Sequence, residues 1–173
     1  MADNPVILLA DAGPLITLAY ADALDVLLLP NWQVQMVDMV LHEVTRNPTP
    51  TSQKIAAWVA QQQLLVRETR IYQRYIASLN AGEKPRKANL GELAIQEVMS
   101  EFALQARPVT GVFLFEDHKV ARASFVLPED CHKISTRAFL LFLEQKGLVE
   151  SAAAIERRAI QAGRAFSSIR FPP

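Results

Sequence analysis

The stretch VFLFEDHKVAR, residues 112–122, has four apolar residues that end abruptly at two carboxylates, Glu116 and Asp117. A short apolar run of this kind is typical of a strand that is buried on both faces of a parallel sheet. PVILLAD, residues 5–11, has the same form and ends at Asp11. Ligands of open parallel sheets bind beyond the carboxyl ends of the strands, so these acids would meet at one edge if the two strands are neighbours.

Short apolar runs alternate with helical patterns along the rest of the chain. We predict further strands over residues 31–37, 64–69 and 131–134, and helices over 14–28, 37–47, 52–63, 71–82, 89–104, 118–125, 136–147 and 151–163. Asp38 is predicted to cap the second of these helices. This alternation predicts an α/β fold with a mostly parallel central sheet flanked by helices. We expect a single domain over residues 1–173, with a core over about 5–147 and a C-terminal helical extension over about 148–173.

Composition narrows the classes of protein. The chain has 173 residues, and its 18 basic residues balance 18 acidic ones, so no global basic field indicates a nucleic-acid partner. Cys131 is the single cysteine, which excludes an internal disulfide and argues against a cysteine-based zinc site. Asp3, rather than a basic stretch, precedes the first apolar run, and no apolar run is long enough to cross a bilayer. We expect a cytoplasmic protein.

Four acids are candidates for a shared site: Asp11, Glu43, Glu92 and Asp117. Each also has an ordinary interpretation, because Asp11 and Asp117 could cap helices, Glu92 could form a capping box with Asn89, and Glu43 could be an exposed helix residue. Three or four carboxylates held together would repel and raise one another's pKa unless a divalent cation neutralised them. Mg²⁺ and Mn²⁺ prefer such oxygen ligands.

Four segments carry a resemblance to a known family: DAGPLITLAYADALDVL (11–27), VLHEV (40–44), NLGELAIQEV (89–98) and FLFEDHKVAR (113–122). Together they resemble the PIN-domain family, and most closely its VapC-like toxin ribonucleases. The pattern of that subgroup is roughly Asp-Thr-Ser-Pro-Leu-Ile, then Glu-Val or Glu-Leu, then Gly-Glu-Ala, then Asp-Asp-x-x-Ala-Arg. The resemblance covers about residues 6–125.

The resemblance implies a PIN-like three-layer fold and a metal-dependent endoribonuclease, the toxin component of a toxin–antitoxin pair. Carried over by position, the catalytic residues would be Asp11, Glu43, Glu92 and Asp117. The ligands of Mg²⁺ or Mn²⁺ would be Asp11, Glu92 and Asp117, with Glu116 as the first of the paired acids. The implied partners are an RNA substrate, a small antitoxin protein and a second copy of the chain.

Two departures from the family pattern leave an alternative open. Ala12 and Gly13 replace the hydroxyl residues that commonly follow the first Asp, and Thr17 is a candidate substitute. Residues 127–149 also differ from the subgroup's usual glycine-rich stretch and final helix. The alternative is a catalytically weak or inactive PIN-fold module that binds RNA or a protein partner.

Basic residues near the motifs are candidates for phosphate contacts that supply affinity without sequence specificity. They are Lys84, Arg86, Lys87, Lys119 and Arg122, with Arg67, Arg70 and Arg74 as further cations. Their ordinary interpretation is a solvated loop and helix surface. The basic and aromatic C-terminal segment, residues 157–173, could contact RNA or pack against a second subunit.

Other catalytic motifs are incomplete. HEVTR (42–46) has Arg46 where a zinc-protease helix needs its second His, and the six glycines form no phosphate-binding loop. A phosphatase with Asp11 as nucleophile would need a second Asp two residues later, where Gly13 stands.

Overall fold

The computed structural model describes residues 4–85, 88–116, 127–165 and 169. Five strands form one sheet in the order β3-β2-β1-β4-β5, and every neighbouring pair is parallel. The strands are β1 (Val6–Ala10), β2 (Gln33–Val37), β3 (Leu65–Arg67), β4 (Thr110–Phe115) and β5 (Cys131–Ser135). The predicted α/β fold is confirmed, and the sheet is parallel throughout the described strands.

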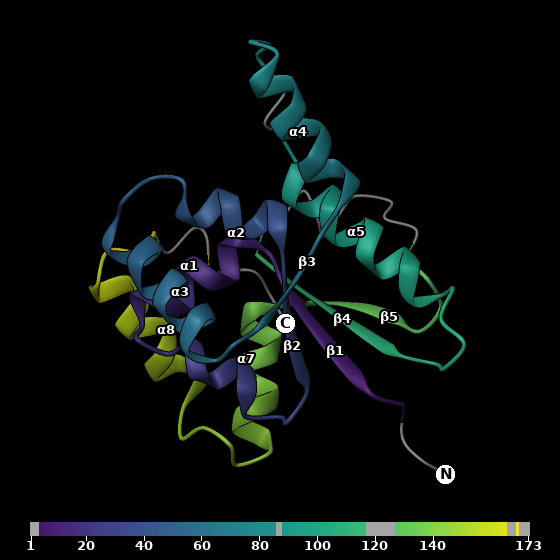
Figure 1. Cartoon of the computed structure of the whole chain (residues 1–173). Coiled ribbons are helices and arrows are strands. Elements are labelled where there is room, and N and C mark those ends of the chain that lie inside the picture. The colour runs from purple at the N-terminus through teal and green to yellow at the C-terminus, as the bar shows by residue number, and fades with distance from the viewer. Residues whose placement is uncertain (1–3, 86–87, 117–126, 166–168, 170–173) are drawn as a thin grey trace.

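Helices cover both faces of the sheet. They are α1 (Ala12–Tyr20), the 3₁₀ helix η1 (Leu24–Leu28), α2 (Asp38–Thr45), α3 (Pro50–Gln61), α4 (Arg70–Asn80), α5 (Leu90–Phe102), α7 (Thr136–Gln145) and α8 (Ala152–Gln161). Figure 1 shows α1, α3, α7 and α8 gathered on one side of the sheet and α5 on the other. The chain steps from β1 toward β3 and then returns to β4 on the other side of β1, so right-handed crossovers place the two sets of helices on opposite faces. The predicted three-layer arrangement is confirmed, and the predicted helix over 118–125 lies outside the described residues.

The central strands β1 and β4 are buried on both faces, as the two apolar runs in the sequence predicted. Leu8 and Leu9 of β1 and Phe113 and Leu114 of β4 are all fully buried. Consecutive residues of a strand point to opposite faces, so a run that is apolar at every position must be covered on both sides. The helix α8 also contributes to this core, through residues such as Ala159. Within the part of the chain that the structure describes, no helix is both long and apolar enough to span a membrane.

Two local predictions were wrong. The expected helix over 14–28 is two helices, α1 and η1, because the chain turns at Asp22, which has a φ of 50°. The N-cap of α2 is Val37, and Asp38 is the first helical residue. The Asp38 carboxylate still accepts the N–H of Met39 in the first turn of α2 at 2.7 Å. It also accepts hydrogen bonds from the backbone N–H and the hydroxyl of Thr69, at 2.7 and 2.8 Å, because these buried donors before α4 need an acceptor.

Candidate acidic site

The adjacency on which the acidic-site prediction depends is present. Strands β1 and β4 are hydrogen-bonded neighbours, with Ala10 opposite Leu114. The backbone N–H of Asp11 donates to the carbonyl of Leu114 at 2.9 Å, so Asp11 lies beside the end of β4. The first strand-ending acid and the start of the Glu116–Asp117 pair therefore share the carboxyl edge of the sheet.

Asp11 and Glu43 converge around Gly91. Asp11 is the N-cap of α1, and its Oδ1 accepts the N–H of Ala12 at 2.8 Å, as its ordinary interpretation predicted. Glu43 Oε1 accepts the N–H of Gly91 at 3.2 Å. A Cβ added to Gly91 would lie 2.7 Å from Glu43 Oε2 and 3.3 Å from Asp11 Oδ1. The two carboxylates therefore close on the same small space, and a glycine is what lets them do so.

A pocket of about 350 Å³ opens beside these acids, and we call it the acidic pocket. It is lined by Asp11, Ala12, Glu43, Arg46, Asn89, Gly91 and Glu92. These residues come from the start of α1, from α2 and from the start of α5. Three of the four predicted catalytic acids thus line one pocket, and the fourth, Asp117, lies outside the described residues.

The start of α5 departs from the expected capping box. Asn89 is the N-cap, but it has a φ of 62°, in the left-handed region, and its side chain makes no capping hydrogen bond. The Asn89 half of a capping box with Glu92 is therefore absent. Asn89 lines the acidic pocket instead.

The electrostatics of the acidic pocket act most clearly on Glu43. Burial, and next the charge of Asp11, raise the pKa of Glu43 from 4.5 to about 7. The Gly91 N–H and the Arg46 guanidinium oppose this increase without cancelling it. Near neutral pH, Glu43 is therefore close to half ionised, so a cation that entered this pocket would shift it toward the ionised form.

The described acids alone do not complete a metal centre. Over residues 4–85, 88–116 and 127–165, no three His, Cys, Asp or Glu side chains are arranged to hold a metal ion. The donor chemistry nevertheless fits a hard divalent cation, since Asp11 and Glu43 converge and Glu92 lines the same pocket. A complete site would need a further ligand, and Asp117 follows Glu116 directly in the sequence.

Glu116 does not line the acidic pocket. Its side chain is buried, and its Oε2 accepts hydrogen bonds from the Thr17 hydroxyl at 2.8 Å and from Arg164 Nη2 at 3.0 Å. Arg164 Nε also donates to Thr17 Oγ1 at 2.9 Å. We call these three residues the clamp. The structure therefore places both Glu116, a predicted metal ligand, and Thr17, a candidate substitute for the missing hydroxyls, in the clamp.

The predicted RNA-binding residues divide in two groups. Lys84 is exposed ahead of α5, whereas Arg86, Lys87, Lys119 and Arg122 lie outside the described residues. Two of the further cations are engaged elsewhere: Arg67 pairs with Glu101 at 2.6 Å and Arg70 with Glu97 at 3.7 Å. Arg164 points inward into the clamp, which neither interpretation of the C-terminal segment predicted.

Sequence reasoning missed two residues of the acidic pocket, Arg46 and Asn89. Arg46 carried a detectable signal, because it follows Glu43 by three residues and residues at that spacing share one face of a helix. Arg46 was considered only as the failure of a zinc-protease motif. Asn89 also carried a signal, because Asn adopts the left-handed backbone conformation more readily than most residues, and its φ is 62°.

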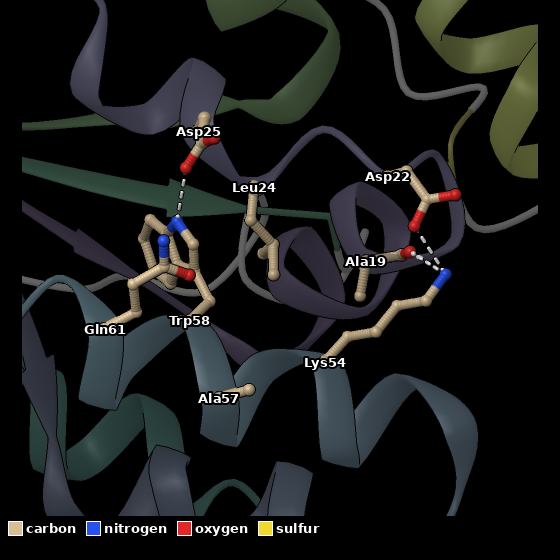
Figure 2. Close-up of a pocket in the computed structure, with 8 residues that line it drawn as sticks. All are labelled: Ala19, Asp22, Leu24, Asp25, Lys54, Ala57, Trp58 and Gln61. Carbon is tan, nitrogen blue, oxygen red and sulfur yellow. Dashed lines mark hydrogen bonds and ion pairs between the residues drawn. The ribbon is translucent and has the colours of Figure 1, made fainter.

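A second pocket, of about 300 Å³, lies between α3 and the segment that joins α1 to η1 (Figure 2). Its charged and aromatic groups are paired with one another. Lys54 Nζ contacts Asp22 Oδ1 at 2.5 Å, and Trp58 Nε1 donates to Asp25 Oδ1 at 2.8 Å. These pairs join α3 to the turn after α1 and to η1, and we assign the pocket a structural role.

No family model matches the sequence, and no curated protein or solved structure matches it either. The class of protein is therefore defined by the fold and the site: a three-layer α/β protein with an acidic pocket at the carboxyl edge of a parallel sheet.

Proposed function

We propose that this protein is a metal-dependent endoribonuclease, acting as the toxin component of a toxin–antitoxin pair, with the acidic pocket as its active site. The observation that carries the proposal is the convergence of Asp11 and Glu43 around Gly91. Like charges this close oppose each other, and the raised pKa of Glu43 reflects that opposition in part. The order and spacing of the PIN-like motifs give the same reaction class.

The roles within the pocket follow from the chemistry of each side chain. Asp11, Glu92 and Asp117 would hold Mg²⁺ or Mn²⁺, and Glu43 would accept the proton of the attacking water, since its carboxylate lies beside Asp11 at the Gly91 end of the same pocket. When bound, the cation supplies a Lewis acid that activates water and stabilises the charge that develops on the phosphate. Arg46, at the rim of the pocket, would contact a phosphate of the RNA.

The proposal extends to location and partners. We place the protein in the cytoplasm, where it would meet RNA, and we infer a second copy of the chain and a small antitoxin that covers the acidic pocket as its protein partners. Lys84, Arg86, Lys87, Lys119 and Arg122 would add phosphate contacts around the pocket, whose affinity for RNA would fall with rising salt.

One observation favours a second candidate function, RNA or protein binding without cleavage. Ala12 lines the acidic pocket at a position where the PIN-like pattern has a hydroxyl residue, and Thr17 lies in the clamp. A pocket without that hydroxyl has fewer groups to orient a phosphate or a water. The two candidates differ in whether bound RNA is cut.

The test is cleavage of a mixed RNA pool, structured and single-stranded, in the presence of Mn²⁺, Mg²⁺ or EDTA. Wild type is compared with Asp11→Asn and Asp117→Asn, and with Glu129→Gln, an exposed acid outside the acidic pocket, as the control. Asp11→Asn is suitable because an Asn oxygen can still accept the Ala12 N–H and cap α1.

We expect wild type and Glu129→Gln to cut RNA with either cation and to stop in EDTA, whereas both Asp→Asn variants lose at least about a hundredfold in rate. Equal cutting by all four proteins would mean that the cutting does not depend on Asp11 or Asp117 and would contradict the proposal. RNA binding without metal-dependent cuts would favour the second candidate.

A further inference from the structure

The clamp joins three distant parts of the chain. Thr17 belongs to α1, Glu116 directly follows β4, and Arg164 lies beyond α8. Thr17 and Arg164 are 147 residues apart in sequence, and their side chains lie within 2.9 Å of each other. Each pair of clamp residues is joined by a hydrogen bond, so the three side chains form a closed triangle.

The ion pair within the clamp is well shielded from water. The Glu116 side chain is 5% exposed and that of Arg164 is 18% exposed. Glu116 Oε1 is buried, and it has no hydrogen-bond partner in the described part of the molecule. Well-packed apolar residues can stabilise a fold as much as a buried ion pair does, so an incompletely satisfied pair is a poor device for stability alone. The location of this ion pair, beside the start of α1, suggests a second role.

The clamp contacts the same turn of α1 that borders the acidic pocket. Gly13 lies in that turn, and a Cβ added to it would come within 3.1 Å of Glu116 Cβ. Asp11 caps the turn through its Oδ1, and its backbone N–H is bonded to the end of β4. The first turn of α1 is therefore held by Glu116 on one side, while its N-cap is a wall of the acidic pocket.

We propose that Arg164 is a positioning residue for the acidic pocket. It holds Glu116 and Thr17 and, through them, fixes the turn of α1 that begins at Asp11. Arg164 touches neither RNA nor metal in this role. The inference rests on the proposed function, because it assigns Arg164 an effect on the affinity of the acidic pocket for a divalent cation.

The test measures the dissociation constant of Mn²⁺ for folded protein by calorimetry, with thermal unfolding recorded separately. Wild type is compared with Arg164→Lys, Arg164→Met and Arg158→Met, the last as a control because Arg158 is an exposed arginine on α8. Binding is measured well below each unfolding midpoint, and near-ultraviolet circular dichroism establishes that each variant has native packing.

We expect Arg164→Met to weaken Mn²⁺ binding by about tenfold or more, as loss of a residue that orients metal ligands typically does. Arg164→Lys retains the charge but replaces the two nitrogens that contact Thr17 and Glu116 by a single one, so it should hold the two residues less well than arginine does, and its loss should be smaller than that of Arg164→Met. Arg158→Met should bind as wild type does. If Arg164→Met does not fold, Arg164→Lys and Thr17→Val carry the test, and each should weaken binding severalfold.

Three other outcomes overturn the inference. An unchanged dissociation constant with a lower unfolding midpoint would make the role of Arg164 purely structural. Tighter Mn²⁺ binding by Arg164→Met would mean that Arg164 withholds Glu116 from the cation. Absence of Mn²⁺ binding by wild type would overturn the proposed function as well, which distinguishes that failure from the other two.

Discussion

The acidic pocket and the clamp lie on two sides of the same turn of α1. Each contains a glutamate, but the charges around the two glutamates are of opposite sign. In the clamp, Glu116 accepts hydrogen bonds from a cationic side chain at 3.0 Å and from a hydroxyl at 2.8 Å. In the acidic pocket, Glu43 accepts one backbone N–H at 3.2 Å and faces a second acid, Asp11. The first carboxylate is ion-paired with Arg164, whereas at the second the like charge of Asp11 outweighs the opposite charge of Arg46.

This difference separates two uses of buried charge. A carboxylate that is paired inside the chain holds distant segments together, as Glu116 holds α1 and the segment beyond α8. A carboxylate whose pKa is raised by burial and by a second acid gains most from a cation supplied by the solvent. Loss of a clamp residue should therefore lower stability in addition to weakening cation binding through the α1 turn, whereas loss of an acid in the pocket should affect mainly binding.

The largest effect on stability is expected from Arg164→Met. Removing one partner of a buried ion pair leaves the other charge buried, so we expect the free energy of unfolding to fall by about 3 kcal/mol. The double variant Glu116→Met, Arg164→Met should recover a substantial part of that loss, because neither charge then remains. Urea unfolding of the single and double variants measures both quantities.

The control for the clamp is Arg158→Met, which should change the free energy of unfolding by less than about 0.5 kcal/mol because Arg158 is exposed. The contrast between the clamp and the acidic pocket would be contradicted if Arg164→Met lowered the free energy of unfolding by as little as Arg158→Met does, since the clamp ion pair would then be no stronger than a surface contact.

A smaller effect is expected from two matched substitutions, Gly91→Ala in the acidic pocket and Gly13→Ala beside the clamp. Each new Cβ meets a glutamate, at 2.7 Å from Glu43 Oε2 and at 3.1 Å from Glu116 Cβ. We expect each to lower the free energy of unfolding by roughly 1–2 kcal/mol through overpacking. Only Gly91→Ala should also lower the pKa of Glu43, because it pushes that carboxylate toward water and away from Asp11.

Titration of the Glu43 carboxyl by NMR separates the two glycine variants. The Gly13→Ala protein should keep the raised pKa of Glu43, since its strain falls on the other side of the α1 turn. An unchanged Glu43 pKa in Gly91→Ala would mean that the carboxylate is not confined by Gly91, and a change in both variants would mean that strain beside the clamp also reaches Glu43 through the turn of α1.

The sequence predicted the features that depend on local pattern. The apolar runs at residues 5–11 and 112–115 predicted buried parallel strands, and their terminal acids predicted the edge at which a site should form. Asp11, Glu43 and Glu92 were named for the pocket that they line. The strand predictions succeeded because burial on both faces and the position of strand ends are determined by a few consecutive residues. Glu43 and Glu92 were named through the resemblance to the PIN-domain motifs, and the catalytic role of the three acids stays a prediction.

Features that depend on distant contacts were missed. Nothing within a few residues of Glu116 or Arg164 indicates that they form an ion pair, because they are 48 positions apart in the sequence and β5, α7 and α8 lie between them. Asp38 was assigned to its own helix because a capping motif is local, whereas its partner Thr69 is 31 residues away. Contacts between distant residues decide which acids line the pocket and which acid lies in the clamp, and this cannot be predicted from the spacing of residues in the sequence.

The smallest expected effect is the pH dependence of stability that Glu43 contributes in metal-free protein. Its pKa is about 7 when folded and 4.5 by its ordinary value, so between these pH values the folded state binds more protons than the unfolded state. The contribution of Glu43 to the free energy of unfolding should therefore be highest below about pH 4.5. It should fall as the pH rises toward 7 and stay low above pH 7. Because Glu43 is half-buried and screened by solvent, we expect a fall of only about 1 kcal/mol.

Glu43→Gln isolates this contribution, because the amide cannot ionise and the other titrating groups remain. Urea unfolding in EDTA at about pH 5 and about pH 8 should show wild type losing stability relative to Glu43→Gln as the pH rises. Saturating Mn²⁺ should remove or reverse that relative loss, since a cation favours the ionised carboxylate. If wild type instead gained stability relative to Glu43→Gln in EDTA, Glu43 would already have its counter-charge within the chain. The acidic pocket would then resemble the clamp, and the contrast between the two regions would no longer hold.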